Sequence, residues 1–150
     1  MQIYLLRHGI ADDARPGQPD SERALTPEGR KRLQAVKRRA GLTTMFTLSS
    51  PYLRAMQTAA IFGGEIVETP TLEPGANPED TWNELRLFKD KAQILCATHE
   101  PLCSNLAAYL LNVPALPMDV KKGALIRIDV DRLGPKPHGT LKWMIVPKLA

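Results

Sequence analysis

The chain has 150 residues, of which 43% are hydrophobic and 24% charged, and its formal net charge is +4. This length and composition are typical of a globular protein with a substantial core, so we expect residues 1–150 to form one domain. The small positive charge favours anionic ligands in general. Basic residues are not interleaved with aromatic ones as in single-stranded nucleic-acid binders, so we expect no nucleic-acid partner.

The cysteines and the N-terminus indicate the compartment. Cys96 and Cys103 lie in apolar surroundings and do not form a C-x-x-C pair, so we expect two buried thiols in a reducing environment. The N-terminus lacks the basic segment and the long apolar stretch of a signal peptide. We therefore expect a cytoplasmic protein with no membrane partner.

The first element is an apolar run, Met1 to Leu6, that ends at Arg7-His8-Gly9. A run of this length suits a buried strand and is far too short to span a membrane. Ligands of open α/β sheets bind outside the carboxyl ends of the strands. The cation and the imidazole at this strand end are therefore candidate binding groups, the alternative being a strand that simply ends in surface polar residues.

Residues 10–25 are polar and interrupted by two prolines and a glycine, which predicts a loop. A helix is expected over 26–40, with Thr26 as its N-cap, Pro27 at its first position and Gly41 as its stop. The basic face of this helix indicates a solvated surface; the alternative is a docking surface for an acidic partner.

A second strand is predicted over 45–48, followed by a helix with Ser50 as N-cap and Pro51 as first residue. Arg54 then lies one turn into a helix that begins at a strand end, where backbone N–H groups and the helix dipole favour an anion. Because a guanidinium binds two phosphate oxygens at once, this is a candidate phosphate site. The apolar stripe expected to face the core consists of Leu53, Met56 and Ala60.

A third strand over 65–67, a helix over 81–89 and a fourth strand over 93–97 continue the alternation. The fourth strand ends at Thr98-His99-Glu100-Pro101, and Pro101 starts another helix. A second imidazole is thus expected between a strand end and a helix start.

The remaining chain has a different pattern. Residues 124–131 and 141–145 alternate between apolar and polar side chains on either side of the turn GPKPHG, which predicts an antiparallel hairpin with His138 at the surface. Strands that alternate with helices, followed by a hairpin, predict an α/β fold. We expect a mainly parallel central sheet flanked by helices on both faces, with the antiparallel hairpin at its edge.

Three strand ends carry the residues Arg7, His8, Arg54 and His99, and in a parallel sheet such ends share one edge. Two guanidiniums suit a dianion such as a phosphoryl group, and a neutral imidazole can attack phosphorus. The chain has no Walker-type glycine loop and no Gly-x-Ser-x-Gly elbow. A zinc site at His8 and His99 is the alternative, which the neighbouring arginines disfavour, so we expect no metal and no cofactor.

Four segments, in this order, resemble the histidine phosphatase superfamily, which shares its fold with the phosphoglycerate mutases: RHGIA, LTPEGR, SSPYLRAMQTA and THEP. The small size and the closing WMIVPK segment are similar to the short SixA-type branch, the phosphohistidine phosphatases. The resemblance spans nearly the whole chain. It implies a single histidine phosphatase domain over residues 1–150 with no separate cap domain.

The resemblance also implies roles for the residues that match. His8 would be the nucleophile and become phosphorylated, Arg7 and Arg54 would hold the phosphoryl oxygens, and His99 would donate to the same oxygens. Arg23 occupies the place of an arginine often seen before the LT-x-x-G segment and is a candidate anion contact only. Ser50 matches the Ser-Pro of the family and is expected to cap a helix.

The proton donor of the larger members has no counterpart in the expected register after the third strand. Ile10 stands where many short relatives carry Asp. An alkoxide needs general acid help, worth about 10²–10⁴-fold, whereas an imidazole that titrates near pH ~6.5 leaves with far less assistance. The absence of a clear acid therefore fits a P–N substrate better than a sugar phosphate. The weak candidates, each of which also fits ordinary loop charge, are Asp12, Asp13, Glu73 and Glu100.

Three functions remain as hypotheses. The first is a phosphatase that hydrolyses phosphohistidine on a protein through a phospho-His8 intermediate. It is favoured because the chain between the third and fourth strands is too short for a cap, and an open pocket admits a protein surface. The second is a phosphatase for a small phosphorylated metabolite, and the third is a non-catalytic phosphate-binding docking module.

Overall fold

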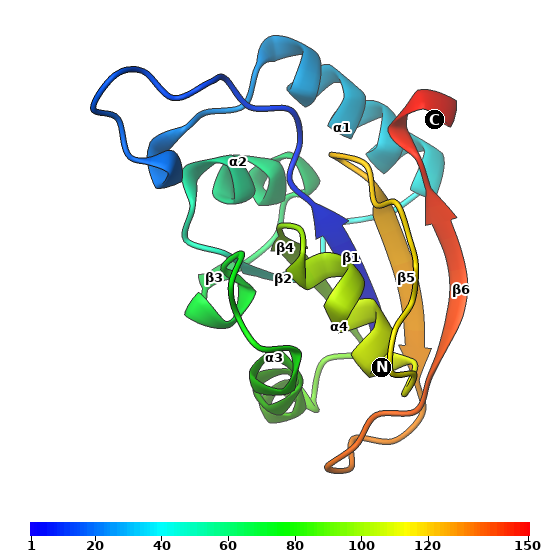
Figure 1. Ribbon diagram of the computed structural model, residues 1–150. Helices are drawn as coiled ribbons and strands as arrows, with labels where there is room; N and C mark the ends of the chain where they lie inside the picture. Colours follow the sequence, from blue (N-terminus) through cyan, green and yellow to red (C-terminus); the bar gives the residue numbers. More distant parts are fainter.

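The central element of the structure is a six-stranded sheet with helices on both faces (Figure 1). The structure is a computed structural model that describes residues 1–150. Across the sheet the strands follow the order β3-β2-β4-β1-β5-β6, in which the first four are parallel and the last two antiparallel to their neighbours. This confirms the predicted fold and its C-terminal hairpin. The strands are β1 (Gln2–Arg7), β2 (Phe46–Ser49), β3 (Ile66–Glu68), β4 (Gln93–Thr98), β5 (Leu125–Val130) and β6 (Gly139–Ile145).

Two α-helices cover each face of the sheet (Figure 1). α1 and α2 lie on one face, and α3 and α4 lie on the other. None of the helices combines the length and hydropathy needed to cross a bilayer. The α-helices are α1 (Pro27–Ala40), α2 (Leu53–Phe62), α3 (Pro78–Leu85) and α4 (Leu102–Leu110), and the short 3-10 turns are η1 (Asp20–Glu22), η2 (Pro70–Leu72), η3 (Arg86–Phe88) and η4 (Pro147–Leu149).

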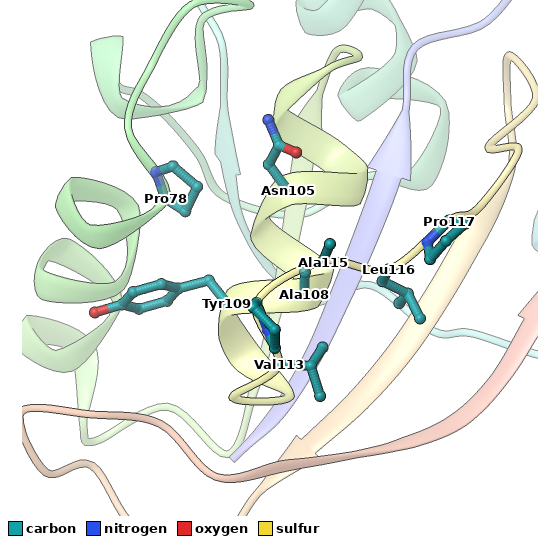
Figure 2. A pocket seen from close by; sticks show the side chains of 9 residues that line it. Pro78, Asn105, Ala108, Tyr109, Val113, Ala115, Leu116 and Pro117 are labelled. Carbon is teal, nitrogen blue, oxygen red and sulfur yellow. The ribbon is translucent and has the colours of Figure 1, made fainter.

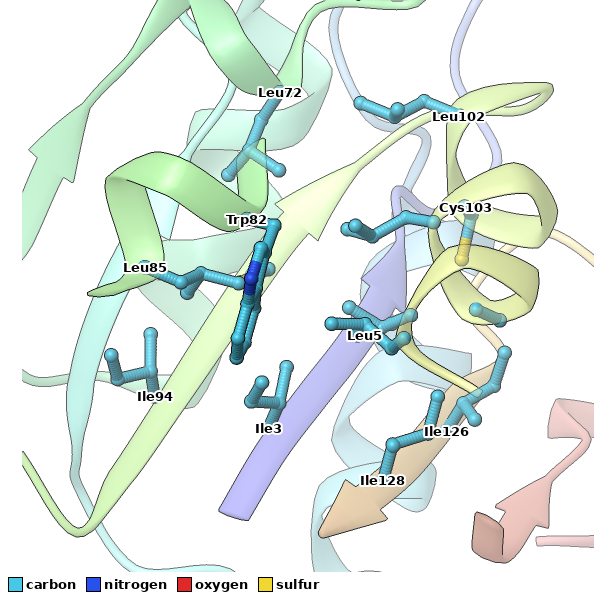
Figure 3. Packing of buried hydrophobic residues seen from close by; sticks show 14 of the residues in the cluster. Ile3, Leu5, Leu72, Trp82, Leu85, Ile94, Leu102, Cys103, Ile126 and Ile128 are labelled. Carbon is cyan, nitrogen blue, oxygen red and sulfur yellow. The ribbon is translucent and has the colours of Figure 1, made fainter. Parts of the chain in front are cut away.

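The helices bury two apolar clusters against the sheet. The larger one has 18 buried residues and joins α3 and α4 to the strands through side chains such as Trp82 and Leu102 (Figure 3). The smaller one has nine and joins α1 and α2 to the opposite face through Leu33 and Phe62. Since burial of one large apolar side chain stabilises a fold by about 1.5–3 kcal/mol, these clusters hold the strand ends in fixed positions.

The first helix begins and ends as its sequence predicts. Thr26 Oγ1 accepts a hydrogen bond from Gly29 N at 2.9 Å, and Gly41 ends α1 with a left-handed φ of 64°. Gly29 also allows a close approach, because a Cβ there would lie 2.4 Å from the carbonyl oxygen of Ile10. α1 is therefore fixed against the chain that leaves β1.

The second helix differs from its prediction in both its start and its buried face. α2 begins at Leu53, with Tyr52 as N-cap, so Ser50 and Pro51 precede the helix. Leu53 is 38% exposed and Ala60 is exposed as well. The buried residues are Arg54, Ala55, Thr58, Ala59 and Phe62. The physical reason is that Arg54 and Thr58 make polar contacts with the end of β1, and these contacts set the rotation of the helix.

The third helix, in contrast, begins earlier than predicted. Asn77 caps it by accepting a hydrogen bond from Glu79 N at 2.9 Å, and Pro78 is its first residue. The chain after Leu85 continues as the separate 3-10 turn η3. His138 is exposed in the turn between β5 and β6, as predicted.

Candidate active site

Three neighbouring strands end at one edge of the sheet, and each is followed by a residue of the predicted site. Arg7 at the end of β1 lies opposite Thr98 at the end of β4. The ladder continues one residue further, because His8 N donates to Thr98 O at 2.9 Å and Ser50 N donates to Ala97 O at 3.0 Å. The sheet itself therefore brings the ends of β1, β2 and β4 together.

Gly123 fixes the end of β1 from the other side. Its N–H is shared between the carbonyl oxygens of Arg7 and His8, at 3.0 Å from each. Gly123 has a φ of 81° and a Cβ there would lie 3.2 Å from Pro147 Cγ. Both constraints favour glycine, which reaches the left-handed region without steric cost.

His8 presents an unprotonated nitrogen to the site. Its Nδ1 lies 2.8 Å from Gly9 O. A carbonyl oxygen only accepts, so Nδ1 carries the proton and Nε2 has the free lone pair. Burial, together with the charges of Arg54, Arg7 and Lys122, lowers the pKa of His8 to about 4 against the opposing effect of the Gly9 hydrogen bond. The ring is therefore neutral at pH 7.

His99 lies beside His8, with 5.0 Å between the ring centroids. Its Nε2 is 2.7 Å from Ser50 Oγ, while its Nδ1 is buried without a hydrogen-bond partner. Tyr52 packs edge-on against the ring at 4.9 Å. Burial is the main cause that lowers the pKa of His99 to about 3, and the charges of His8 and Arg54 act in the same direction. His99 is therefore also neutral at pH 7.

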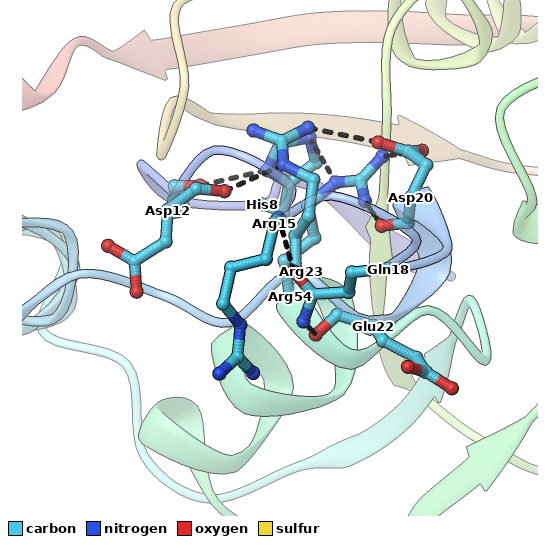
Figure 4. Close-up of polar contacts among 9 residues, drawn as sticks. His8, Asp12, Arg15, Gln18, Asp20, Glu22, Arg23 and Arg54 are labelled. Carbon is cyan, nitrogen blue, oxygen red and sulfur yellow. Dashed lines mark hydrogen bonds and ion pairs between the residues drawn. The ribbon is translucent and has the colours of Figure 1, made fainter.

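Arg54 joins His8 to the loop that precedes α1 (Figure 4). Its Nε points to His8 Nε2 at 3.4 Å. Its Nη1 donates to Asp20 O at 2.8 Å and its Nη2 to Asp20 Oδ2 at 3.0 Å. Tyr52 lies under the guanidinium, 5.1 Å from Cζ to the ring centroid. The guanidinium is 5% exposed, so its position is fixed on all sides.

Asp20 is the carboxylate that lies at this site, and the sequence analysis missed it. Hydrogen bonds from Arg23 and Arg54 lower the pKa of its carboxyl group below the usual value, although burial acts in the opposite direction. Its loop has no periodicity and no motif, so no sequence signal pointed to it. An Asp held in the ionised form accepts hydrogen bonds but has no proton to donate.

The two remaining arginines of the prediction have different surroundings. Arg7 Nη1 donates to Val120 O at 2.7 Å, and Arg7 Nε is buried with no hydrogen-bond partner. Arg23 Nε donates to Asp12 O at 2.7 Å and its Nη1 pairs with Asp20 Oδ1 at 3.0 Å. Arg23 and Arg54 thus bind the same carboxylate, that of Asp20 (Figure 4). Arg23 itself makes no hydrogen bond to His8 or His99.

The four carboxylates considered as proton donors do not contact the two imidazoles. Glu100 Oε1 accepts a hydrogen bond from Ser104 N at 2.7 Å at the start of α4. Asp12 and Asp13 are exposed, and Asp12 contacts Arg23 through its backbone carbonyl. Glu73 follows η2 and its side chain makes no hydrogen bond or ion pair.

The arrangement suits a tetrahedral dianion. Two neutral imidazoles and the guanidinium of Arg54 lie together at one sheet edge, and the charge of Arg7 acts on both rings, so the site attracts negative charge and repels a metal cation. No three His, Cys, Asp or Glu side chains lie together as a candidate metal site. Ser50 differs from its expected role, because its Oγ contacts His99 and accepts from Tyr52 N at 3.2 Å outside α2.

A hollow of about 500 Å³ lies between α3, α4 and the chain that follows α4, away from the imidazoles (Figure 2). Apolar residues line most of it, and Tyr109 is its only titratable side chain. It contains none of the predicted site residues. The chemistry of the molecule is therefore at the sheet edge and not in this hollow.

Comparison with known proteins identifies the family. The family model of the histidine phosphatase superfamily (branch 1) matches residues 3–77, half of the chain. An uncharacterised protein of Picosynechococcus sp. is 33% identical in an alignment of length 111 that covers 67% of this chain and 67% of that protein.

Solved structures extend the similarity to the whole chain. The protein histidine phosphatase SixA complexed with tungstate is 28% identical, with a TM-score of 0.84 over 99% of this chain and 98% of that one. The alpha-ribazole phosphatase from Shigella flexneri is 17% identical, with a TM-score of 0.79 over 98% of this chain and 97% of that one, and shows the shared fold. The chain therefore belongs to the histidine phosphatase superfamily, resembles its SixA-type members and is a phosphatase.

Proposed function

We propose that this phosphatase hydrolyses phosphohistidine on a protein substrate through a phospho-His8 intermediate. The observation that carries the proposal is the geometry of His8, whose Nε2 lone pair lies 3.4 Å from the Nε of Arg54. A neutral imidazole beside a buried guanidinium is a nucleophile placed where an anionic phosphoryl group binds.

In the first step, His8 Nε2 attacks the phosphorus atom. A new P–N bond forms at His8 while the P–N bond of the substrate breaks, and the substrate ring, protonated on its other nitrogen, takes the electron pair and leaves as neutral imidazole. Arg54 and the free Nε of Arg7 would neutralise the phosphoryl oxygens, and His99 would donate to them from its unpartnered Nδ1. Phosphoryl transfer depends mainly on such positioning and charge neutralisation.

In the second step, water attacks phospho-His8. The P–N bond breaks, its electron pair returns to Nε2, and the proton of the attacking water ends on the released phosphate. Nδ1 keeps its proton throughout and donates it in a hydrogen bond to the Gly9 carbonyl oxygen at 2.8 Å. The ring therefore leaves as neutral imidazole without a separate acid. The same hydrogen bond therefore serves both steps.

The state of Asp20 supports a P–N substrate. Its carboxyl group, the one in contact with Arg54, is kept ionised by two arginines. An alkoxide leaving group would lack the general acid that is worth about 10²–10⁴-fold. A departing imidazole does not need it to the same degree.

The segment between β3 and β4 supports a protein substrate. Residues 69–92 form η2, α3 and η3, and Leu72, Trp82 and Leu85 from this segment are fully buried in the core of the sheet. This segment is thus used for packing against the sheet, which supports a domain without a separate cap. We accordingly propose that residues 1–150 act as one catalytic domain without a cap.

The cellular setting follows from the thiols. Cys96 and Cys103 are free and buried, as predicted, and burial raises the pKa of Cys96 to about 12. Unpaired thiols of this kind are typical of a reducing compartment. We propose that the enzyme acts in the cytoplasm on a phosphorylated protein.

Trapping the intermediate tests the mechanism. After brief incubation with a synthetic peptide carrying ³²P-phosphohistidine, the wild-type enzyme should hold a label that is stable in alkali and labile in acid. His8→Asn should hold none, while the matched control His138→Asn, changed at an exposed turn, should label normally. Equal labelling of His8→Asn would overturn the intermediate, and phosphate binding without any label would favour a docking module.

A substrate panel tests the substrate class. We expect kcat/KM on the phosphohistidine peptide to exceed that on phosphoserine peptide and on sugar phosphates. A higher kcat/KM on a sugar phosphate would instead support the small-metabolite function.

A further inference from the structure

A basic hollow adjoins the active site at Arg7. It has a volume of about 660 Å³, and Arg7 forms part of its wall. Its other charged residues come from three separate segments: Arg32 on α1, Lys121 and Lys122 before β5 with their neighbour Asp119, and Lys148 in η4. We call this surface the basic hollow.

The charges of the basic hollow are unbalanced. Five basic side chains and one carboxylate line it. Asp119 pairs with Lys121 at 2.7 Å, and Arg32 pairs with Glu28 at 2.8 Å. Lys122 and Lys148 form no ion pair and are exposed. A concave surface with unpaired positive charge attracts anionic groups and concentrates them.

The basic hollow is connected to the reactive residues through the backbone. Lys122 precedes Gly123, whose N–H binds the carbonyl oxygens of Arg7 and His8. Arg7 Nη1 donates to Val120 O, within the same segment. The hollow is therefore adjacent in structure to the segment that carries His8, and the charge of Lys122 acts on the His8 ring.

The form of the charged groups indicates what occupies the hollow. Arg54 in the phosphoryl pocket is 5% exposed and held on all sides, as is needed for one fixed tetrahedral anion. The lysines of the hollow are long, exposed and carried by different segments, so they adapt to several carboxylates at once but fix none of them. Such a distribution suits the acidic surface of a protein and not a second phosphate of a small molecule.

We propose that the basic hollow binds Asp and Glu side chains that flank the phosphohistidine of the substrate protein. This inference rests on the proposed function and adds to it the chemistry of the surface that the enzyme selects. The hollow would raise the encounter rate and lower KM without entering the chemical step, because contacts of this kind act on association.

Two synthetic peptides test the proposal, each with one phosphohistidine, flanked either by glutamates or by glutamines. Wild-type enzyme should prefer the glutamate peptide, and the preference should fall at high salt. The variant Lys148→Gln, which removes a lysine without an ion pair, should lose about twofold to fivefold in kcat/KM on the glutamate peptide through KM, since exposed charge pairs have small individual effects. Its kcat/KM on the glutamine peptide should stay unchanged.

A matched control separates local from overall charge. Lys89 and Lys136 are exposed and lie outside the hollow, so Lys89→Gln/Lys136→Gln should behave as wild type on both peptides. Equal losses on both peptides, or no loss on either, would overturn the inference while leaving phosphohistidine hydrolysis established by the wild-type rates. If the wild type cleaves neither peptide, the proposed function fails and the inference falls with it.

Discussion

Asp20 accepts two hydrogen bonds from the guanidinium of Arg54, one through its carbonyl oxygen at 2.8 Å and one through its carboxylate at 3.0 Å. In the free enzyme, a carboxylate therefore occupies one of the nitrogen atoms that a phosphoryl group would use. The loop before α1 holds the guanidinium in place, and under the proposed mechanism it would compete with the substrate for Arg54.

Asp20→Asn should bind inorganic phosphate more tightly than the wild type. The side chain keeps its size and the carbonyl contact is unaffected, but the competing charge is removed. Because the carboxylate is largely exposed, the gain is about twofold to fivefold, the range of a surface ion pair. The inhibition constant of phosphate measures it, and Asp90→Asn, at an exposed position far from the site, is the control. Weaker phosphate binding would show that Asp20 acts mainly by positioning Arg54.

Arg54→Lys should lose about 10²–10³-fold in kcat, the usual cost of removing one preorganised transition-state donor. Lysine keeps the charge but not the fork that reaches both His8 and Asp20. Steady-state kinetics give the loss, and a melting curve close to that of the wild type shows that the fold is intact. Arg38→Lys, on the exposed face of α1, should have normal kcat. Near-normal turnover of Arg54→Lys would refute the role of the fork.

Ser50→Ala should lower kcat about tenfold or more with little effect on KM, since general acid–base and donor groups act in the transition state. Ser50 Oγ accepts from Tyr52 N, so its hydroxyl hydrogen is free to donate to His99 Nε2. With the hydroxyl hydrogen in that direction, the proton of His99 lies on Nδ1, the nitrogen without a partner and the one that the proposed mechanism uses as a donor. Ser50→Thr, which keeps the hydroxyl, should restore most of the rate. Equal losses in both variants would mean that packing, and not the hydroxyl, matters.

The two active-site imidazoles should titrate well below the usual range of histidine in an NMR experiment. Burial and neighbouring positive charge lower the pKa of His8 to about 4 and that of His99 to about 3. A lowered pKa means that both rings stay neutral as the pH falls from 7 to 5, and His8 loses its lone pair only near pH 4. Loss of kcat/KM should follow the His8 titration after subtraction of the uncatalysed rate. A midpoint of His8 near 6.5 would contradict the burial argument.

Much of the architecture could be predicted because local signals agreed with one another. Thr26, Pro27 and Gly41 mark the limits of α1, and period-two alternation marks β5 and β6. Arg7, His8 and His99 follow apolar runs directly, so the rule that parallel strands end at one edge was sufficient to bring them together. The strand ends confirm that expectation.

The rest depends on contacts between distant residues. Asp20 reaches Arg54 across 34 positions from a loop without any periodicity. The rotation of α2 was predicted wrongly because apolar residues were assumed to face the core, whereas Thr58 faces inward to accept from Gly9 N at 3.1 Å. Ser50 was predicted to be a helix cap because it precedes a proline at the start of a helical segment. Its contact with His99 could not be predicted, because it joins two strand ends that become neighbours only through the strand order of the sheet. Such relationships are not present in any single segment.

The position of β4 between β2 and β1 has a consequence for the order of events during synthesis. His8 is translated among the first residues, but His99 follows a strand that must insert into the middle of a sheet, and Gly123, whose N–H binds the carbonyl oxygens of Arg7 and His8, comes later still. Under the proposed mechanism, a partly emerged polypeptide would therefore carry a histidine that cannot yet accept phosphate productively. Turnover would then begin only after Gly123 has bound the end of β1.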